Sequence, residues 1–105
     1  MKSYKVKVSP NAKKELKDRL AYLVKVKQNK QAANNVMQDY RETRESLSRI
    51  AGSIKEADSK KLRERSLKRI NFHRHDYFLL FRIDGEVVTV TNVFHFLEDY
   101  ENKLK

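Results

Sequence analysis

The sequence predicts an α+β fold: an N-terminal strand, an antiparallel helical hairpin, a three-stranded antiparallel meander and a short C-terminal helix, with the helices packed on one face of the sheet. Three observations support this prediction. An alternating run opens the chain, two long amphipathic segments follow it, and an Asp84-Gly85 pair separates two apolar, β-branched runs near the end. With 105 residues the chain is long enough for one core, so we expect residues 1–105 to form a single domain.

The first half of the chain contains the predicted first strand and the helical hairpin. Residues 4–9 alternate apolar residues with lysine, which indicates a half-buried strand. Ser9-Pro10 then supplies a helix cap and a first helical residue, and the first helix is expected over residues 10–27. A second helix is expected over residues 31–51, ending at Gly52. Their short connection predicts an antiparallel pair whose apolar stripe covers a sheet, with a partner-binding arm as the alternative.

The second half of the chain contains the predicted meander. Residues 53–65 are polar and are expected to connect the helices to strands over residues 67–72, 77–83 and 86–94. Residues 97–105 are expected to form one or two helical turns. If Asp84 and Gly85 are the two central turn residues, Ile83 faces Glu86 and the direction of every strand side chain follows.

This register assigns the strand side chains to two faces. The predicted core face carries Ile70, Phe72, Tyr77, Leu79, Phe81, Ile83, Val88, Val90 and Phe94. The predicted opposite face carries Arg69, Asn71, His73, Phe78, Leu80, Arg82, Val87, Thr89, Thr91, Val93 and His95. Because the second face mixes cations, imidazoles and hydroxyls with apolar residues, we expect it to be the working surface.

The charge of the chain predicts an anionic partner. Its 24 Lys and Arg residues exceed its 14 Asp and Glu residues, which gives a net charge of +10. Such an excess attracts polyanions. The predicted RNA contacts are Lys60, Lys61, Arg63, Arg65, Lys68 and Arg74, and the alternative for the run between residues 60 and 69 is a solvated connector.

Several classes of site and location are excluded by composition. The chain has no cysteine and only two glycines, so it has no disulfide framework, thiolate zinc site or glycine-rich phosphate loop. We expect no metal and no cofactor. Neither a signal peptide nor a membrane span is apparent, and the prediction is a cytoplasmic protein without a membrane partner.

The remaining candidate chemistry is metal-free cleavage of RNA. Attack of a 2′-hydroxyl on its phosphate needs a base, an acid and a cation, which His and Arg supply near neutral pH. All three histidines, His73, His75 and His95, flank the open end of the predicted hairpin. Three arginines, Arg69, Arg74 and Arg82, are expected on or near the same face. The alternative is that these histidines are ordinary polar residues at loop and strand ends.

The order of these elements resembles the RelE/ParE superfamily of bacterial type II toxin-antitoxin systems. The resemblance rests on the opening YKVKVSPNAKKEL, the aromatic strand ending in Arg82 and His95 at the close of the last strand, and it covers essentially the whole chain. It implies a growth-inhibiting toxin neutralised by a cognate antitoxin, which we expect to be acidic. RelE-like members cut mRNA in the ribosomal A site, whereas ParE-like members inhibit DNA gyrase.

Matching positions within the superfamily give a divided prediction about the target. Phe78 stands where RelE-type enzymes usually have an arginine, and Phe96 and Leu97 replace the basic residues expected after the last strand. YafQ-type ribonucleases use histidines at the middle-strand entry, an Asp-aromatic pair and a final histidine. This chain matches that pattern with His73 or His75, Asp76-Tyr77 and His95.

The resulting hypothesis is a ribosome-associated mRNA interferase that needs no metal. His95 and either His73 or His75 would serve as general base and acid, Arg69 and Arg82 would stabilise the phosphorane, and Asp76 would orient a histidine. Two alternatives stay open. The long helical hairpin favours a ParE-like inhibitor of DNA gyrase without nuclease activity, and the charge alone would suit a basic nucleic-acid-binding module.

Overall fold

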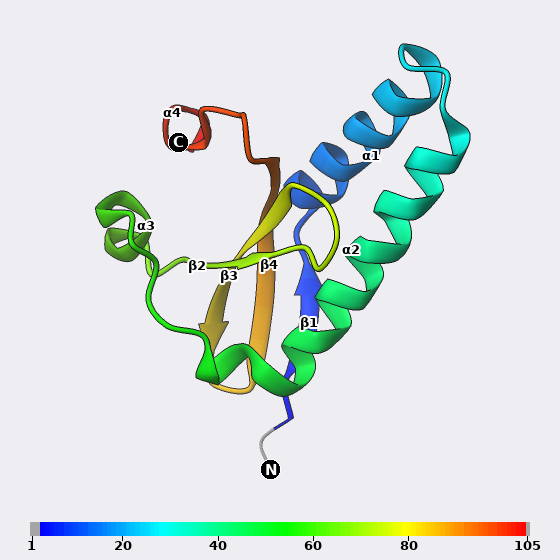
Figure 1. The fold of residues 1–105 in the computed structure, drawn as a ribbon. Helices are drawn as coiled ribbons and strands as arrows, with labels where there is room; N and C mark the ends of the chain where they lie inside the picture. The colour runs from blue at the N-terminus through cyan, green and yellow to red at the C-terminus, as the bar shows by residue number, and fades with distance from the viewer. Residues whose placement is uncertain (1–2, 105) are drawn as a thin grey trace.

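The computed structural model describes residues 3–104, which form the predicted α+β fold (Figure 1). In chain order the elements are β1 (Lys5–Val8), α1 (Pro10–Lys25), α2 (Lys30–Ile50), the 3₁₀ turn η1 (Ala51–Ser53), α3 (Lys60–Glu64), β2 (Lys68–Asn71), β3 (Tyr77–Asp84), β4 (Val87–His95) and α4 (Tyr100–Lys103). The sheet has the order β1-β4-β3-β2, and β1 runs parallel to β4. The helical hairpin, followed by η1 and α3, therefore carries the chain from β1 at one edge of the sheet to β2 at the other edge.

Local capping begins both long helices, at the predicted Ser9-Pro10 for α1 and at an Asn29 cap that was not predicted for α2. The Ser9 hydroxyl accepts a hydrogen bond from the Ala12 amide at 3.1 Å, and Pro10 is the first residue of α1. The Asn29 side chain accepts one from the Ala32 amide at 2.9 Å and begins α2. Both helices pack on one face of the sheet, where their apolar side chains contact alternate residues of β3 and β4. The largest core cluster contains Leu16, Val36, Tyr40, Leu47, Phe72, Tyr77, Leu79, Phe81, Val88, Val90 and Val93.

The register of the β3–β4 hairpin differs from the prediction in two ways. Asp84 pairs with Val87, so Gly85 and Glu86 are the central turn residues and the predicted pairing of Ile83 with Glu86 is wrong. Gly85 has a φ of +61°, a conformation that favours glycine. In addition, Phe81 pairs with Val90 whereas Leu80 pairs with Asn92, which leaves Thr91 as the extra residue of a β-bulge.

This bulge reverses the side chains at the end of β4. Val93 joins the core beneath the helices, whereas Phe94 packs with Phe78 on the opposite side of the sheet. The prediction had placed Phe94 on the core face and Val93 on the other, so both assignments are wrong. His95 pairs with Tyr77 and lies on the side of α1 instead of the side of Arg82. The β2–β3 pairing is as predicted, with Ile70 opposite Leu79.

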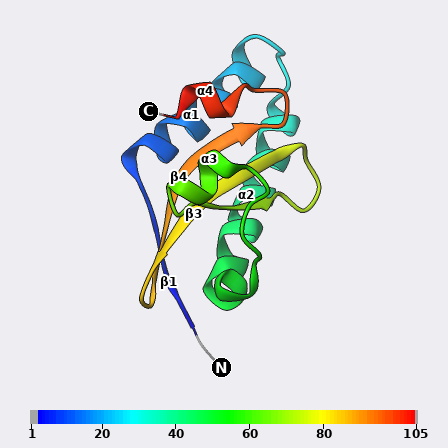
Figure 2. The ribbon, with the colours of Figure 1, turned by 90° about the vertical axis from the view of Figure 1, so that its left-hand side faces the viewer.

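A second, smaller core covers the other face of the sheet. Figure 2 shows α3 and α4 in front of β3 and β4, with α2 behind. The buried residues of this second core are Leu62, Leu67, Phe78, Leu80, Phe94 and Leu104. The predicted polar connector over residues 53–65 thus contains a short helix, which Ser59 caps and Leu62 anchors with 1% of its surface exposed. Part of the face expected to be a working surface is therefore interior.

Candidate functional site

The loop between β2 and β3 is tied to helix α2 by one buried carboxylate. Asp39 is fully buried and accepts hydrogen bonds from the His73 amide at 3.0 Å, the Arg74 amide at 2.9 Å and His75 Nδ1 at 2.7 Å. Burial raises the pKa of Asp39, but these hydrogen bonds outweigh burial and hold that pKa below its usual value. Sequence reasoning assigned the orienting carboxylate to Asp76 and missed Asp39, although an aspartate on an apolar helix stripe signals a buried partner.

The His73 and Arg74 side chains of this loop lie on the side of α2. Arg74 forms a two-pronged ion pair with Glu42, at 2.9 and 3.2 Å. This pair raises the pKa of Arg74 and lowers that of Glu42. His73 lines a shallow hollow of about 390 Å³ together with Arg41, Glu45 and Arg49. The loop therefore directs His73 and Arg74 toward the helices and away from Arg69 and Arg82.

The two arginines proposed to stabilise a phosphorane lie on the opposite face of the sheet. The Arg69 guanidinium lies 3.8 Å from the centroid of the Phe78 ring and 5.2 Å from that of Phe96. Arg82 forms an ion pair with Asp84 at 2.9 Å, beside the hairpin turn. The six predicted catalytic residues are thus divided among the Asp39-bound loop, the outer face and the end of β4, and the structure does not bring them into one site.

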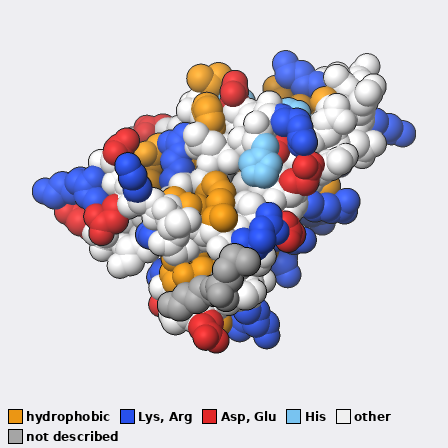
Figure 3. Space-filling view, turned by 60° about the horizontal axis from the view of Figure 1, so that its bottom comes forward, with side chains coloured by type: hydrophobic (Ala, Val, Ile, Leu, Met, Phe, Trp, Pro, Cys, Tyr) orange, Lys and Arg blue, Asp and Glu red, His pale blue; other side chains and the backbone are white. Residues whose placement is uncertain are grey.

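The basic residues predicted to contact RNA are largely engaged within the second layer. Lys61 donates to the Glu101 carbonyl, Arg63 to the Ala57 carbonyl at 2.9 Å and Lys68 to the Ile54 carbonyl at 2.7 Å. Lys60 faces Glu64 at 3.9 Å, and Arg65 lines a hollow that Arg82 and Thr91 also line. On the face shown in Figure 3, Lys and Arg side chains are spread around the outline with Asp and Glu among them. RNA binding by this run stays a prediction.

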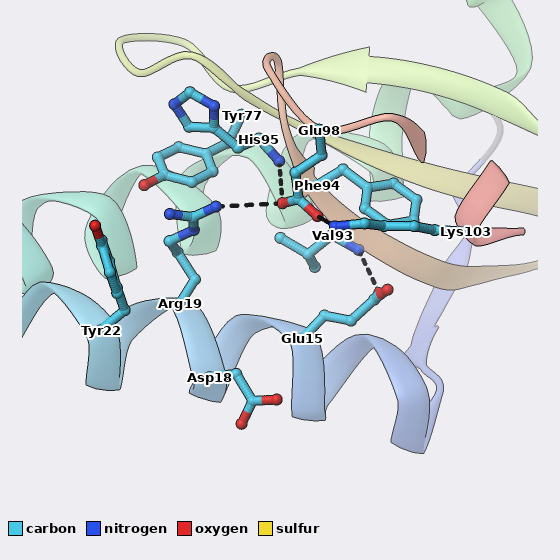
Figure 4. A pocket seen from close by; sticks show the side chains of 10 residues that line it. All are labelled: Glu15, Asp18, Arg19, Tyr22, Tyr77, Val93, Phe94, His95, Glu98 and Lys103. Carbon is cyan, nitrogen blue, oxygen red and sulfur yellow. Dashed lines mark hydrogen bonds and ion pairs between the residues drawn. The ribbon is translucent and has the colours of Figure 1, made fainter. Parts of the chain in front are cut away.

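The end of β4 lines a pocket of about 470 Å³ that we call the His95 pocket (Figure 4). Helix α1 contributes one side of it, β3 and β4 another, and the C-terminal segment the third. Its lining residues are Glu15, Asp18, Arg19, Tyr22, Tyr77, Val93, Phe94, His95, Glu98 and Lys103. Sequence reasoning found only His95 as a site residue here. The missed signal was the polar stripe of α1 at positions 15, 18, 19 and 22, which has the spacing of one helix face.

Glu98 organises the charges of this pocket. Its carboxylate accepts hydrogen bonds from the His95 amide at 2.9 Å and from Lys103 Nζ at 2.7 Å, and it contacts Arg19 at 3.4 Å. Burial raises the pKa of Glu98, but the bonds from Lys103 and the His95 amide outweigh it and leave the pKa below its usual value. Glu15 accepts from the Val93 amide at 2.9 Å, and burial raises its pKa.

Aromatic rings enclose the Arg19 guanidinium. It lies 5.5 Å from the Tyr22 ring centroid and 5.7 Å from that of Tyr77, within range of cation–π attraction. The Tyr77 ring in turn meets the His95 imidazole edge-on at 4.9 Å. Burial raises the pKa of Tyr77, so its hydroxyl remains a hydrogen-bond donor at neutral pH.

The hydrogen bonding of His95 defines its tautomer. Its Nδ1 accepts a hydrogen bond from the Leu97 amide at 3.1 Å. Because an amide can only donate, Nδ1 carries no proton, and the neutral ring carries its proton on Nε2. The ring nitrogen that could accept a proton, Nδ1, is therefore already hydrogen-bonded to the Leu97 amide. This hydrogen bond weighs against His95 as a general base in this conformation.

A second hollow, of about 560 Å³, lies between α1 and α2. We call it the hairpin groove. Its floor is apolar and includes Leu16, Leu20, Val24 and Met37. Four basic residues, Lys13, Lys17, Lys25 and Arg44, complete the lining, and no acidic residue does so among those described. An apolar floor with a basic rim is complementary to an acidic amphipathic segment.

Between residues 3 and 104, no group of three or more His, Asp or Glu side chains is placed to hold a metal ion. Within the same range, no helix combines the length and hydropathy needed to cross a membrane.

Comparisons with known proteins give one family and one fold. Residues 6–100 match the family model described as the ParE toxin of the type II toxin-antitoxin system parDE. A solved structure titled as a chromosomal ParDE TA system from P. aeruginosa aligns with a TM-score of 0.74, 17% identity, and coverage of 89% of this chain and 96% of that chain. At this identity the alignment shows a shared fold. No curated protein sequence matches the chain.

Proposed function

The chain belongs to the ParE toxin family of type II toxin-antitoxin systems, and we propose that it arrests growth by inhibiting DNA gyrase without cleaving RNA. The family match over residues 6–100 carries this proposal, because ParE-like members of the superfamily act on gyrase. The long α1–α2 hairpin, a ParE-like feature, is consistent with it. The sequence analysis preferred an mRNA interferase and kept a ParE-like gyrase inhibitor as an alternative. The family match supports that alternative better.

The arrangement of the candidate residues also favours gyrase over mRNA. Cleavage of RNA without a metal needs an acid, a base and a cation around one phosphate. Here His73 and His75 lie at the Asp39-bound loop, Arg69 and Arg82 lie across the sheet, and Nδ1 of His95 accepts from Leu97. A residue set this dispersed supports binding more readily than general acid–base chemistry.

Parallel readouts of DNA and RNA damage test the gyrase proposal. We expect the purified toxin to block supercoiling of relaxed plasmid by gyrase, and its expression in cells to cause DNA breaks and the SOS response while mRNA stays intact. Pre-incubation with the product of the accompanying antitoxin gene provides the control and should abolish both effects. Rapid loss of translated mRNA, with normal supercoiling activity, would overturn the proposal and restore the interferase hypothesis.

We further propose that the hairpin groove receives an acidic segment of the cognate antitoxin. Its apolar floor supplies area for an amphipathic segment, and Lys13, Lys17, Lys25 and Arg44 supply complementary charge. The toxin itself carries a net charge of +10, which favours fast association with an acidic partner.

Charge reversal on the rim tests this placement. In the double variant Lys17→Glu, Lys25→Glu we expect antitoxin affinity to fall at least about tenfold at low salt, because rim charges set electrostatic complementarity. The effect should shrink as salt rises. Lys55→Glu, at an exposed lysine outside the groove, is the control for a single charge reversal elsewhere on the surface and should bind normally. Equal affinities for all three proteins, measured by titration calorimetry, would place the antitoxin elsewhere.

A further inference from the structure

We propose that the end of the helical hairpin binds duplex DNA, with its lysines on the phosphates and a stripe of carboxamides on α2 in the major groove. Residues 25–35, where α1 ends and α2 begins, form what we call the hairpin tip. In Figure 1 the hairpin tip lies at the upper right, away from the sheet. The proposal concerns a ligand held by the toxin itself, so it goes beyond gyrase inhibition and does not depend on it.

The charge of the hairpin around its tip is unbalanced. Residues 19–38 contain four Lys or Arg residues and neither Asp nor Glu. Lys25, Lys27 and Lys30 are exposed, and none of them forms an ion pair within residues 3–104. Elsewhere on the same two helices exposed cations do pair with carboxylates four positions away, as Lys14 and Arg49 show. A cationic surface without such compensation attracts a polyanion.

A stripe of four carboxamides follows these lysines along α2. Gln31, Asn34, Asn35 and Gln38 are exposed, and their spacing places them on one face of the helix. None of the four makes a side-chain hydrogen bond to the chain between residues 3 and 104. Asparagine is a weak helix former, and an exposed helix face is usually stabilised by charged pairs four residues apart. Helix stability therefore does not explain the stripe, whereas Asn and Gln side chains hydrogen-bond both base edges and phosphates.

Backbone hydrogen bonds fix the conformation of the hairpin tip. The Lys27 amide donates to the Tyr22 carbonyl at 3.2 Å. The Asn29 amide donates to the Leu23 carbonyl at 3.0 Å, across Gln28, whose φ is +51°. The Lys27 ammonium also lies 5.9 Å from the centroid of the Tyr22 ring, within range of cation–π attraction. Because the turn is already ordered, less conformational freedom is lost when it binds a ligand.

Composition and shape favour DNA over an acidic protein or a duplex RNA. Protein interfaces are enriched in aromatic residues, Met and Arg and depleted in Lys. In the hairpin tip every cation is a lysine, and Val26 is its one exposed large apolar residue. The major groove of B-form DNA admits an α-helix, whereas the major groove of A-form RNA is too narrow for side chains to read. A carboxamide stripe on the exposed face of a helix therefore suits DNA.

Binding of the full chain to a fluorescein-labelled DNA duplex, measured by anisotropy over a series of salt concentrations, tests the proposal. We expect saturable binding whose affinity falls linearly with salt on logarithmic axes. Unlabelled duplex DNA should compete better than duplex RNA, single-stranded DNA or polyglutamate at matched ionic strength. The proposal is overturned if the chain at micromolar concentration does not bind the duplex in about 50 mM salt, or if any of the three other polyanions competes as well as duplex DNA.

A pair of lysine replacements separates the hairpin tip from net charge. The double variant Lys27→Gln, Lys30→Gln removes two phosphate contacts, so we expect the salt slope to decrease by about 2 and low-salt affinity to fall about tenfold. The double variant Lys5→Gln, Lys7→Gln removes the same charge from exposed side chains of β1 and should bind like the parent protein. Lys25 is left unchanged because it also lines the hairpin groove. Equal losses in the two variants would mean that net charge alone drives binding, and would overturn the proposal.

A third double variant tests the carboxamide stripe. Asn34→Ala, Asn35→Ala removes hydrogen-bonding groups without changing the charge, and the higher helix propensity of alanine keeps α2 helical. We expect DNA affinity to fall about tenfold, the cost of losing a good contact to a base, while the salt slope stays the same. Circular dichroism checks that the variant is folded. An unchanged affinity in the folded variant would overturn the proposal.

Discussion

Asp39→Ala is expected to lower the free energy of unfolding by about 3 kcal/mol, because it leaves donors of a buried network without an acceptor. Asp39 is fully buried and accepts from His75 and from the His73 and Arg74 amides. Removing one partner of such a network costs more than removing an exposed ion pair. Urea denaturation monitored by circular dichroism measures the change.

Glu42→Ala is the matched control for this prediction. It removes the exposed ion pair with Arg74 from the same helix and the same loop. Exposed pairs contribute about 1 kcal/mol or less, so we expect a much smaller loss of stability. If the two variants were equally stable, Asp39 would not be the anchor of the loop.

The same carboxylate predicts a pH dependence. The pKa of Asp39 is lower in the folded protein than its usual value, so its ionised form stabilises the fold at pH values above the unfolded pKa. That contribution is lost as the pH falls from about 5 through the folded pKa. In Asp39→Asn the stability should therefore change less with pH in this acidic range. Parallel pH profiles for the two proteins would contradict the assignment.

Phe78→Ala is expected to destabilise the protein by about 3 to 5 kcal/mol, the usual cost of truncating a buried aromatic residue. Phe78 has no exposed surface and packs against Phe94 and Tyr100, with ring centroids 5.8 and 5.2 Å away. The Arg69 guanidinium covers its face at 3.8 Å. Loss of this ring would open a cavity in the second core and release Arg69.

Phe96→Ala provides the comparison for Phe78. Phe96 contacts the same ring at 6.1 Å between centroids, but 41% of its surface is exposed. We expect a loss of about 1 kcal/mol or less, because partial exposure limits the area returned to water. Chemical denaturation of both variants distinguishes the two sites. Near-equal losses would mean that the second core does not depend on Phe78.

The position of Phe78 also explains why this chain lacks an arginine that is usual in RelE-type enzymes. RelE-type enzymes usually have an arginine at the matching position, and in this chain that position lies at the centre of the second core. An arginine there would bury an uncompensated charge. Here the Arg69 guanidinium, from the neighbouring strand β2, stacks on the Phe78 ring. The residue type at 78 is therefore dictated by packing of α3 and α4.

The sequence by itself determined the two long helices, the four strands and their order, but not the short helix α3. Local signals were sufficient for this: Ser9-Pro10 begins α1, a polar break separates α1 from α2, and alternating or apolar runs form the four strands. The prediction of an α+β fold in the RelE/ParE superfamily is confirmed by the family match and the shared ParE-like fold. These features depend on backbone propensity and hydrophobic period, which residues close in sequence specify.

Only the tertiary structure decided how the side chains at the ends of those elements are arranged into sites. The carbonyl of Thr91, the extra residue of the β4 bulge, accepts hydrogen bonds from the Ser9 hydroxyl at 3.2 Å and from the side-chain Nδ2 of Asn11 at 3.4 Å. These partners are about eighty positions away, so no local pattern predicts the bulge that places His95 against Tyr77 on the side of α1. Asp39 meets His75 in the same way, across 36 positions. Long-range hydrogen bonds, which local periodicity does not encode, therefore define both sites.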